Sequence, residues 1–164
     1  MLINNFELKL IKNIQNNNIE LVSRCISFPF NTVSFIVLCI ILYFTKIFSL
    51  YNLFFLAGGS LFVFILKIIF KRSRPYNCDN NIANKSKKTH LDISNNYSFP
   101  SGHSFISMLF TLMLSKKLNN KYLNIIPVLV GFSRIYLGVH YLTDVIFGFI
   151  FGYIYFNLIC KYLK

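Results

Sequence analysis

The chain is organised around residues 133–144, which read SRIYLGVHYLTD. Arginine, histidine and aspartate are costly to bury in such an apolar run unless they pair with one another or with a ligand. His140 and Asp144 are four residues apart, so a helix would place them on one face, with the carboxylate within reach of the imidazole. Gly138 separates Arg134 from His140 and predicts two helix ends that meet at a short bend. This combination is typical of a site that binds an oxyanion and holds a nucleophile.

The composition predicts that this site belongs to an integral membrane protein. The 164 residues suffice for one domain, and 55% of them are hydrophobic, with 19 Phe and 10 Tyr. Several apolar runs approach the ~20 residues that a bilayer-spanning helix needs. The net charge of +12 lies between these runs, which favours lipid headgroups and anionic substrates over nucleic acid as partners. The four cysteines lack paired spacing, so we interpret them as reduced packing residues.

The apolar pattern predicts an all-α fold, a multi-pass membrane helical bundle with about five spans. The expected spans are 31–48, 50–70, 103–118, 122–138 and 141–160. With five spans, the end of the second, the start of the third and the junction of the last two fall on one membrane face. Polar residues interrupt the apolar pattern at these three places, so they can build a single site.

Two further segments complete the predicted organisation. Residues 1–30 are expected to form an N-terminal amphipathic segment at the membrane interface, and residues 31–164 the transmembrane domain. The polar loop over 77–97 fits either a lid over the site or a disordered segment. His90 in this loop has no partner pattern and is interpreted as a solvated residue.

Basic residues mark the end of the second span. Lys67 and Arg74 are seven residues apart, which is two helical turns, so one helix face would carry both together with Lys71. Pro75 is expected to end that helix. Three cations on one stripe suit phosphate or diphosphate, although a cluster that follows the positive-inside rule would give the same pattern.

A polar turn precedes the third span, where residues 98–104 read SFPSGHS. The Pro-Ser-Gly turn is expected to open a helix and to expose backbone N–H groups at its positive end. Gly102 lets the backbone approach an oxyanion, the Ser101 hydroxyl can donate to it, and His103 lies at the mouth of this nest. A helix start capped by serine, with a histidine facing solvent, would give the same pattern.

Together the three segments read Lys-x6-Arg-Pro, Pro-Ser-Gly-His and Ser-Arg-x5-His-x3-Asp. This order resembles the tripartite signature of the type 2 phosphatidic acid phosphatase (PAP2) family, which bacterial acid phosphatases and vanadium haloperoxidases share. The matching positions are Lys67, Arg74, Pro75, Pro100, Ser101, Gly102, His103, Ser133, Arg134, His140 and Asp144. The runs YSFPSGH at 97–103 and TDVIFGF at 143–149 are most similar to the eukaryotic polyisoprenoid diphosphate phosphatase branch, which includes presqualene diphosphate phosphatases.

The resemblance implies an integral membrane phosphatase that acts on lipid phosphates without a metal or other cofactor. Polyisoprenoid diphosphates would be preferred, and phosphatidate, lysophosphatidate and sphingoid phosphates are the alternative substrates. His140 would form a phosphohistidine, Asp144 would orient it, and His103 would act as general acid and then as base. The groups that would hold the phosphate oxygens are Lys67, Arg74, Ser101, Gly102 and Arg134. Lys71 and Arg72 lie outside the signature and are expected to meet a second phosphate or lipid headgroups.

Alternatives to this reading stay open. A haloperoxidase would use the same cradle for vanadate, although such enzymes are usually larger and soluble. A catalytically silent membrane scaffold would keep the fold, yet scaffolds of this kind tend to lose a catalytic histidine or arginine, and none is missing here. Only five acidic residues occur, and one belongs to the constellation, so a carboxylate cage for Mg²⁺ is not expected. The short spans suggest a thin membrane such as the endoplasmic reticulum.

Overall fold

The structure is a computed structural model and describes residues 5–86 and 97–162. Within these ranges every regular element is a helix, as the apolar pattern predicts. The longer elements are α1 (Asn5–Gln15), α2 (Glu20–Ser27), α3 (Thr32–Phe44), α4 (Leu50–Phe70), α6 (Gly102–Leu118), α7 (Ile126–Tyr136) and α8 (Leu142–Ile159). The short ones are η1 (Phe28–Phe30), α5 (Pro75–Cys78), η2 (Lys121–Ile125) and η3 (Cys160–Tyr162).

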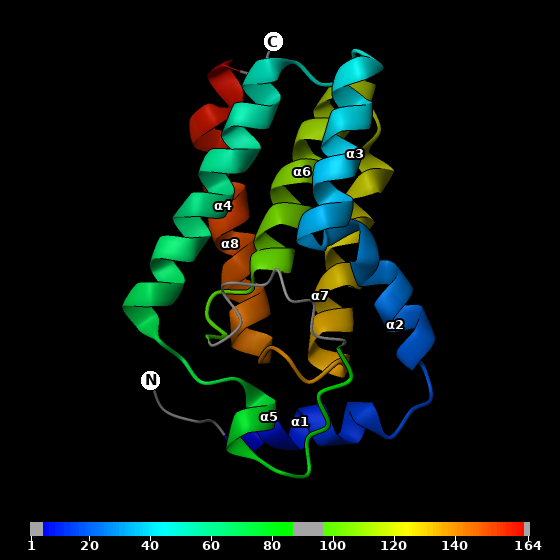
Figure 1. Ribbon diagram of the computed structural model, residues 1–164, viewed down its shortest axis with the longest axis vertical. Coiled ribbons are helices and arrows are strands. Elements are labelled where there is room, and N and C mark those ends of the chain that lie inside the picture. Colours follow the sequence, from blue (N-terminus) through cyan, green and yellow to red (C-terminus); the bar gives the residue numbers. More distant parts are fainter. Residues whose placement is uncertain (1–4, 87–96, 163–164) are drawn as a thin grey trace.

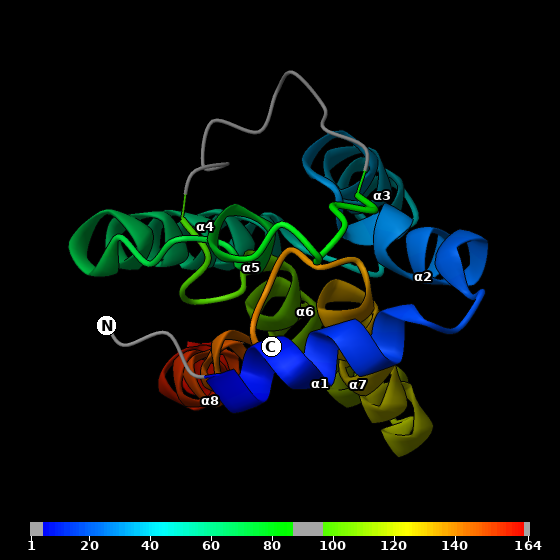
Figure 2. The ribbon, with the colours of Figure 1, turned by 90° about the horizontal axis from the view of Figure 1, so that it is seen from below.

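Five helices form the bundle, and α6 is its central member. Figure 1 shows α3, α4, α6, α7 and α8 running along the long axis, while α1 lies across one end. Seen along that axis, α6 lies in the middle of the others (Figure 2), and it contacts α4, α7 and α8. Its buried residues, among them Phe105, Leu109 and Met113, are spread along its length and form much of the main hydrophobic core.

Two glycines bring α8 against α6. A Cβ atom on Gly148 would lie 2.8 Å from the Ser101 carbonyl oxygen, and one on Gly152 would lie 2.8 Å from the Phe105 carbonyl oxygen. Small residues four apart allow such close backbone approach between membrane helices. At the start of the two helices the Ser101 N–H donates to the Asp144 carbonyl at 3.0 Å, so this packing places two motif segments side by side.

The flanks of the bundle are apolar, which makes this an integral membrane protein. Large apolar side chains such as Phe54, Ile69 and Leu158 are exposed, as expected where hydrocarbon replaces water. Two segments, Leu50–Cys78 and Leu142–Tyr162, are long and apolar enough to cross a membrane. The count rises to three if Glu20–Phe30 and Thr32–Phe44, which meet at a 53° bend, form one broken span. The bundle helices correspond to the five predicted spans, but α6 and α7 are short for independent crossings.

The end of α4 differs from the prediction. The helix ends at Phe70 rather than continuing to Pro75, because Lys71 adopts a left-handed conformation (φ 47°) and its N–H donates to the Lys67 carbonyl. Arg74 is extended, as proline favours for the residue before it, and Pro75 begins α5. The prediction that Lys67, Lys71 and Arg74 share one helix face is therefore wrong.

The N-terminal helices pack against the rest of the chain at the end of the bundle that α1 crosses. Leu8 and Ile11 of α1 pack against Ile82 and Ile135, and α2 packs against α7. The first part of the predicted 77–97 loop is anchored here, since Gln15 Nε2 donates to the Ala83 carbonyl at 2.8 Å and Gln15 Oε1 accepts from the Ala83 N–H at 3.1 Å. Residues 87–96 of that loop, with His90, lie outside the described residues.

Candidate active site

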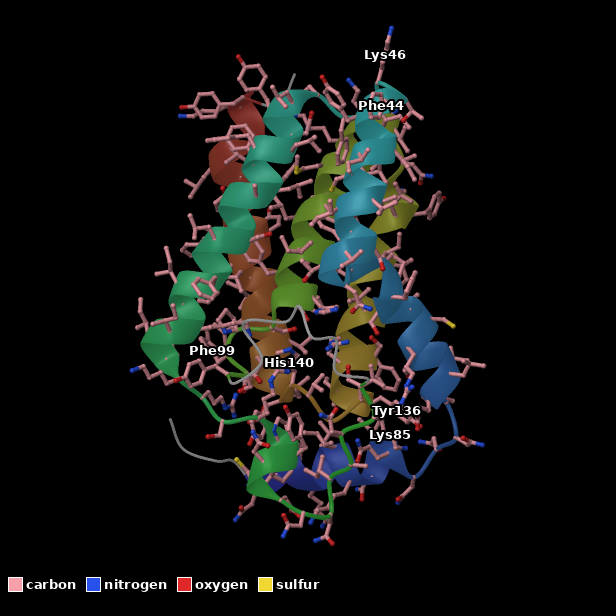
Figure 3. All side chains as sticks on the ribbon, in the orientation of Figure 1. Phe44, Lys46, Lys85, Phe99, Tyr136 and His140 are labelled. Atoms are coloured by element: carbon pink, nitrogen blue, oxygen red, sulfur yellow. The ribbon has the colours of Figure 1, made fainter. Side chains whose placement is uncertain are left out.

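The three motif segments meet at the end of the bundle that α1 covers. Figure 3 shows Phe99 and His140 toward this end and Lys46 at the opposite one. Lys67 Nζ donates to the Tyr97 carbonyl at 3.1 Å, which joins the end of α4 to the segment before α6. Arg74 Nη1 donates to the Val139 carbonyl at 3.2 Å, which joins the segment after α4 to the loop between α7 and α8. These two contacts bring the three segments together at one end of the bundle.

His140 lies in a loop rather than on a helix. The predicted bend is present, since α7 ends at Tyr136, Gly138 has a φ of 73°, and α8 begins at Leu142. A Cβ atom at Gly138 would also lie 2.5 Å from the Ala83 carbonyl oxygen, so both conformation and space favour glycine. The bend turns the loop back over the start of α8.

Asp144 lies beside the buried His140 although the two do not share a helix. Nδ1 of His140 is 3.6 Å from Oδ2 of Asp144, which is longer than a hydrogen bond. The same Oδ2 accepts the Tyr141 N–H at 2.9 Å and so caps the start of α8. The imidazole therefore turns its Nδ1 edge toward a carboxylate that the helix holds in place.

Electrostatics favour the neutral imidazole at His140. Burial lowers the pKa of His140 well below its ordinary value of 6.5, and the cations Arg74, Lys67 and Arg134 lower it further. A hydrogen bond with the backbone of Ser98 opposes these effects without reversing them. At neutral pH the ring is unprotonated, which is the state that a nucleophile needs.

The site contains more buried cations than buried carboxylates. Lys67 is 5% exposed, Arg74 7% and Arg134 6%, and Arg72 is buried with them. Among the described residues these four cations are accompanied by two buried carboxylates, Glu7 and Asp144. Such an excess is unfavourable in an apolar surrounding unless an anion joins it.

The start of α6 supplies a helix N-terminus to the same site. The Ser101 hydroxyl caps the helix by accepting from the Ser104 N–H at 3.3 Å and the Ser104 hydroxyl at 2.9 Å, which leaves its own proton to donate. A Cβ atom on Gly102 would lie 3.7 Å from Val63 and 4.0 Å from Lys67, ordinary contact distances. Packing therefore does not require glycine at this position, whereas close approach of a ligand to the backbone would.

His103 has a partner that the sequence pattern did not indicate. Its Nε2 lies 3.0 Å from Oδ1 of Asn31, the residue immediately before α3. The contact links the predicted general acid to the bend between η1 and α3. No motif spacing connects two residues 72 positions apart.

Arg72 corrects a further expectation, because carboxylates hold it rather than a second phosphate or headgroups. Its Nη1 donates to Asp144 Oδ1 at 2.6 Å and its Nη2 to Glu7 Oε2 at 2.9 Å. The sequence pattern predicts a different role for Arg72 and does not single out Glu7. One signal was present, since Glu7 is one of only five acidic residues and lies one and four residues before the apolar positions Leu8 and Ile11 of α1.

Across the described ranges, no group of three or more His, Cys, Asp or Glu side chains could hold a metal ion. The groups at the site are the cations, the N-terminus of α6, two imidazoles and the Asp144 carboxylate. This donor set binds oxyanions and can transfer protons and a phosphoryl group.

Comparison with known proteins gives a consistent result. The family model of the PAP2 superfamily matches residues 48–164. Phosphatidylglycerophosphatase B of Bacillus subtilis (strain 168) is 41% identical over 76 residues, which cover 38% of this chain and 37% of that protein. Undecaprenyl-diphosphatase of Sulfolobus acidocaldarius is 36% identical over 91 residues, which cover 54% and 42%. The chain thus matches about two fifths of the length of these curated relatives.

Two crystal structures share the arrangement of the helices. The transmembrane PAP2 type phosphatidylglycerolphosphate phosphatase of Bacillus subtilis superposes with a TM-score of 0.73 at 26% identity, over 97% of this chain and 87% of that one. LpxE of Aquifex aeolicus superposes with a TM-score of 0.77 at 22% identity, over 98% and 99%. The second likeness concerns the fold alone.

Proposed function

This chain belongs to the PAP2 superfamily, and from this premise we propose that it is a membrane phosphatase that hydrolyses the phosphate groups of lipids. The excess of buried cations over buried carboxylates is the observation that carries the proposal. A phosphate group with up to about two negative charges at neutral pH would offset this excess. Its apolar tail would lie beside the exposed apolar side chains of the bundle.

In the first step we propose that Nε2 of His140 attacks phosphorus, since Nδ1 is turned toward Asp144. The bond between phosphorus and the leaving oxygen breaks, and protonated His103 gives its proton to that oxygen. Asp144 stabilises the phosphorylated imidazolium that results. Lys67, Arg74 and Arg134, with the Ser101 hydroxyl and the Gly102 N–H, would hold the other phosphate oxygens.

In the second step a water molecule attacks the phosphohistidine. Neutral His103 takes the proton from this water, the phosphorus–nitrogen bond breaks, and inorganic phosphate leaves. His140 returns to its neutral state and His103 to its protonated state. Neither step requires a metal ion.

Polyisoprenoid diphosphates are the substrates we propose first. The run at 97–103 supports this choice, and one matched relative is named undecaprenyl-diphosphatase. Glycerophospholipid substrates are the second candidate, because another relative is named phosphatidylglycerophosphatase B.

We further propose five membrane crossings by α3, α4, α6, α7 with η2, and α8, with residues 1–30 at the interface. Residence in the endoplasmic reticulum stays a prediction that cell fractionation tests.

Phosphate release by the detergent-purified full chain tests the function. Farnesyl diphosphate, phosphatidate and phosphatidylglycerophosphate are assayed side by side in excess EDTA, with a His140→Ala variant as control. We expect release that survives EDTA and disappears in the variant, fastest with the prenyl diphosphate. Folded protein that releases phosphate from none of these lipids would instead support a silent scaffold. Bromide oxidation that depends on added vanadate would support a haloperoxidase.

A further inference from the structure

Glu7 on α1 belongs to a buried charge network that extends from Asp144 through Arg72 to residues outside the PAP2 signature. The side chain is 3% exposed, and both carboxylate oxygens are engaged. Oε2 accepts from Arg72 Nη2 at 2.9 Å, while Oε1 accepts from the Thr143 N–H at 2.8 Å and the Thr143 hydroxyl at 2.9 Å. Thr143 directly precedes Asp144. Through Glu7, α1 is therefore hydrogen-bonded to the first turn of α8, next to Asp144.

Arg72 connects Glu7 to Asp144. Its Nη1 donates to Asp144 Oδ1 at 2.6 Å, and its guanidinium group lies 3.8 Å from the centre of the Tyr141 ring. The backbone is held as well, since the Arg72 carbonyl accepts the Ser98 N–H at 2.7 Å. The guanidinium therefore bridges two carboxylates in a buried position and has little room to turn away from either.

The sharing of Arg72 determines how much negative charge Asp144 presents to His140. Asp144 contacts Arg72 with one oxygen and approaches His140 Nδ1 at 3.6 Å with the other. If Arg72 had Asp144 as its only anionic partner, the guanidinium would neutralise the carboxylate and draw it away from the imidazole. With Glu7 as a second carboxylate at Arg72, the group of Glu7, Arg72 and Asp144 carries a net negative charge. This charge favours the imidazolium of His140 that forms during phosphoryl transfer.

We propose that Glu7 is a positioning residue of this active site, which acts through Arg72 to keep Asp144 charged and directed at His140. The amphipathic helix α1 is on this account part of the catalytic apparatus and not only an interfacial anchor. Figure 3 shows His140 toward the end of the bundle that α1 crosses. The inference rests on the proposed phosphatase function and adds to it residues from outside the family signature.

The test compares Glu7→Gln with the unchanged full chain in the phosphate-release assay. Glutamine keeps an oxygen that can accept from both Thr143 donors, so α1 can still dock, but the charge opposite Arg72 is lost. We expect kcat to fall about tenfold or more, the scale on which outer partners of catalytic groups act. KM should stay within about twofold, because no group that binds the phosphate has changed. Glu7→Asp, which keeps the charge, should recover most of the loss.

Asp79→Asn provides a matched control, because Asp79, which follows α5, also contacts α1. Asp79 forms an ion pair with Lys12 of α1 at 2.6 Å, in a more exposed position than the pair of Glu7 and Arg72. The Asp79→Asn variant therefore also removes a carboxylate that holds α1 in place. We expect its kcat to be unchanged. An equal loss of kcat in Asp79→Asn and Glu7→Gln would overturn the inference, since loosening of α1 would then explain both.

The outcomes distinguish failure of the proposed role of Glu7 from failure of the proposed phosphatase function. If the unchanged chain is active, His140→Ala is inactive and Glu7→Gln retains full kcat, the inference is wrong and the function stands. If the unchanged chain is inactive, or His140→Ala is equally active, the proposed function fails and the inference with it. Should Glu7→Gln not fold, Arg72→Lys decides, because lysine cannot bridge two carboxylates in the same geometry. A fall in its kcat supports the inference, and an unchanged kcat overturns it.

Discussion

Nε2 of His103 lies 3.0 Å from Oδ1 of Asn31, so the proposed general acid is held by the residue immediately before α3. The hydrogen bond limits rotation of the imidazole, which must present a proton in one direction and later receive one from water. Replacing Asn31 by alanine is expected to lower kcat about tenfold, which is part of the roughly 10²–10⁴-fold that a positioned acid–base group contributes.

The control for this prediction is Asn52→Ala. Asn52 Oδ1 accepts the Ser49 N–H at 2.8 Å at the start of α4, far from the site, and is likewise an asparagine bound near a helix start. We expect this variant to keep full activity with at most a small loss of stability. Full activity in Asn31→Ala would show that His103 needs no fixed partner.

Substitutions of Lys67 and Lys71 should differ sharply in effect although the two residues are only four positions apart. Lys67 is buried and donates to the Tyr97 carbonyl, whereas Lys71 is exposed at the end of α4. Lys67→Met is expected to lower kcat/KM by about a hundredfold or more through lost stabilisation of the transition-state charge. Lys71→Met should change it by less than about twofold, because an exposed charge is screened by solvent. Steady-state kinetics on both variants, with circular dichroism to verify folding, makes the comparison.

The contrast between these two lysines also shows how far sequence patterns reach. A periodic apolar run predicts where α4 lies, because burial and lipid exposure are summed over many residues. It does not predict the left-handed turn at Lys71, which depends on one local backbone choice. The seven-residue spacing of Lys67 and Arg74 predicted one helix face for both, whereas Arg74 lies on an extended segment after α4.

The network around Arg72 could not be derived from spacing at all. Glu7 and Arg72 are 65 residues apart, and Arg72 and Asp144 are 72 apart, so only the packing of α1 and α8 brings them together. Signature motifs locate groups expected to touch a ligand, because the chemistry limits both residue type and order. Residues that orient these groups are chosen by the neighbouring helices, and their partners become visible only in the folded structure.

The contact between α6 and α8 should be sensitive to a single methyl group. In Gly148→Ala the new Cβ atom would meet the Ser101 carbonyl oxygen at 2.8 Å and Ser104 Cβ at 2.9 Å, neither of which can move without shifting α6. Overpacking of this kind costs roughly 1–3 kcal/mol. We expect a lower melting temperature in detergent, and reduced activity because the Ser101 N–H bond to Asp144 would be stretched.

Gly58→Ala is the matched control for this packing prediction. A Cβ atom there would meet only the hydroxyl of Tyr155, at 2.8 Å, and that hydroxyl is the end of a side chain that can rotate away. Alanine also favours a helix over glycine by up to about 1 kcal/mol. The melting temperature should therefore stay the same or rise. Equal destabilisation by both substitutions would contradict the close approach of α6 and α8.

The protonation of His140 can be measured directly by NMR of protein labelled with ¹⁵N-histidine. The chain contains three histidines, so a His90→Gln/His103→Gln variant leaves His140 as the one labelled ring. Burial and the cations Arg74, Lys67 and Arg134 lower the pKa of His140 well below 6.5, so the ring should stay neutral as the pH falls from about 8 to about 6. In this variant a midpoint at or above 6.5 without ligand would contradict the arrangement.

The same shift predicts how stability depends on pH. Because the folded state binds the proton of His140 less readily than the unfolded state, this residue has no effect on stability well above pH 6.5. As the pH falls below 6.5, the unfolded state takes up the proton first, and the folded state loses stability. Inorganic phosphate should oppose this loss, since a bound anion offsets the three cations and raises the pKa of His140. Thermal melts across this pH range, with phosphate and with chloride at equal ionic strength, should show a stabilisation that is specific to phosphate.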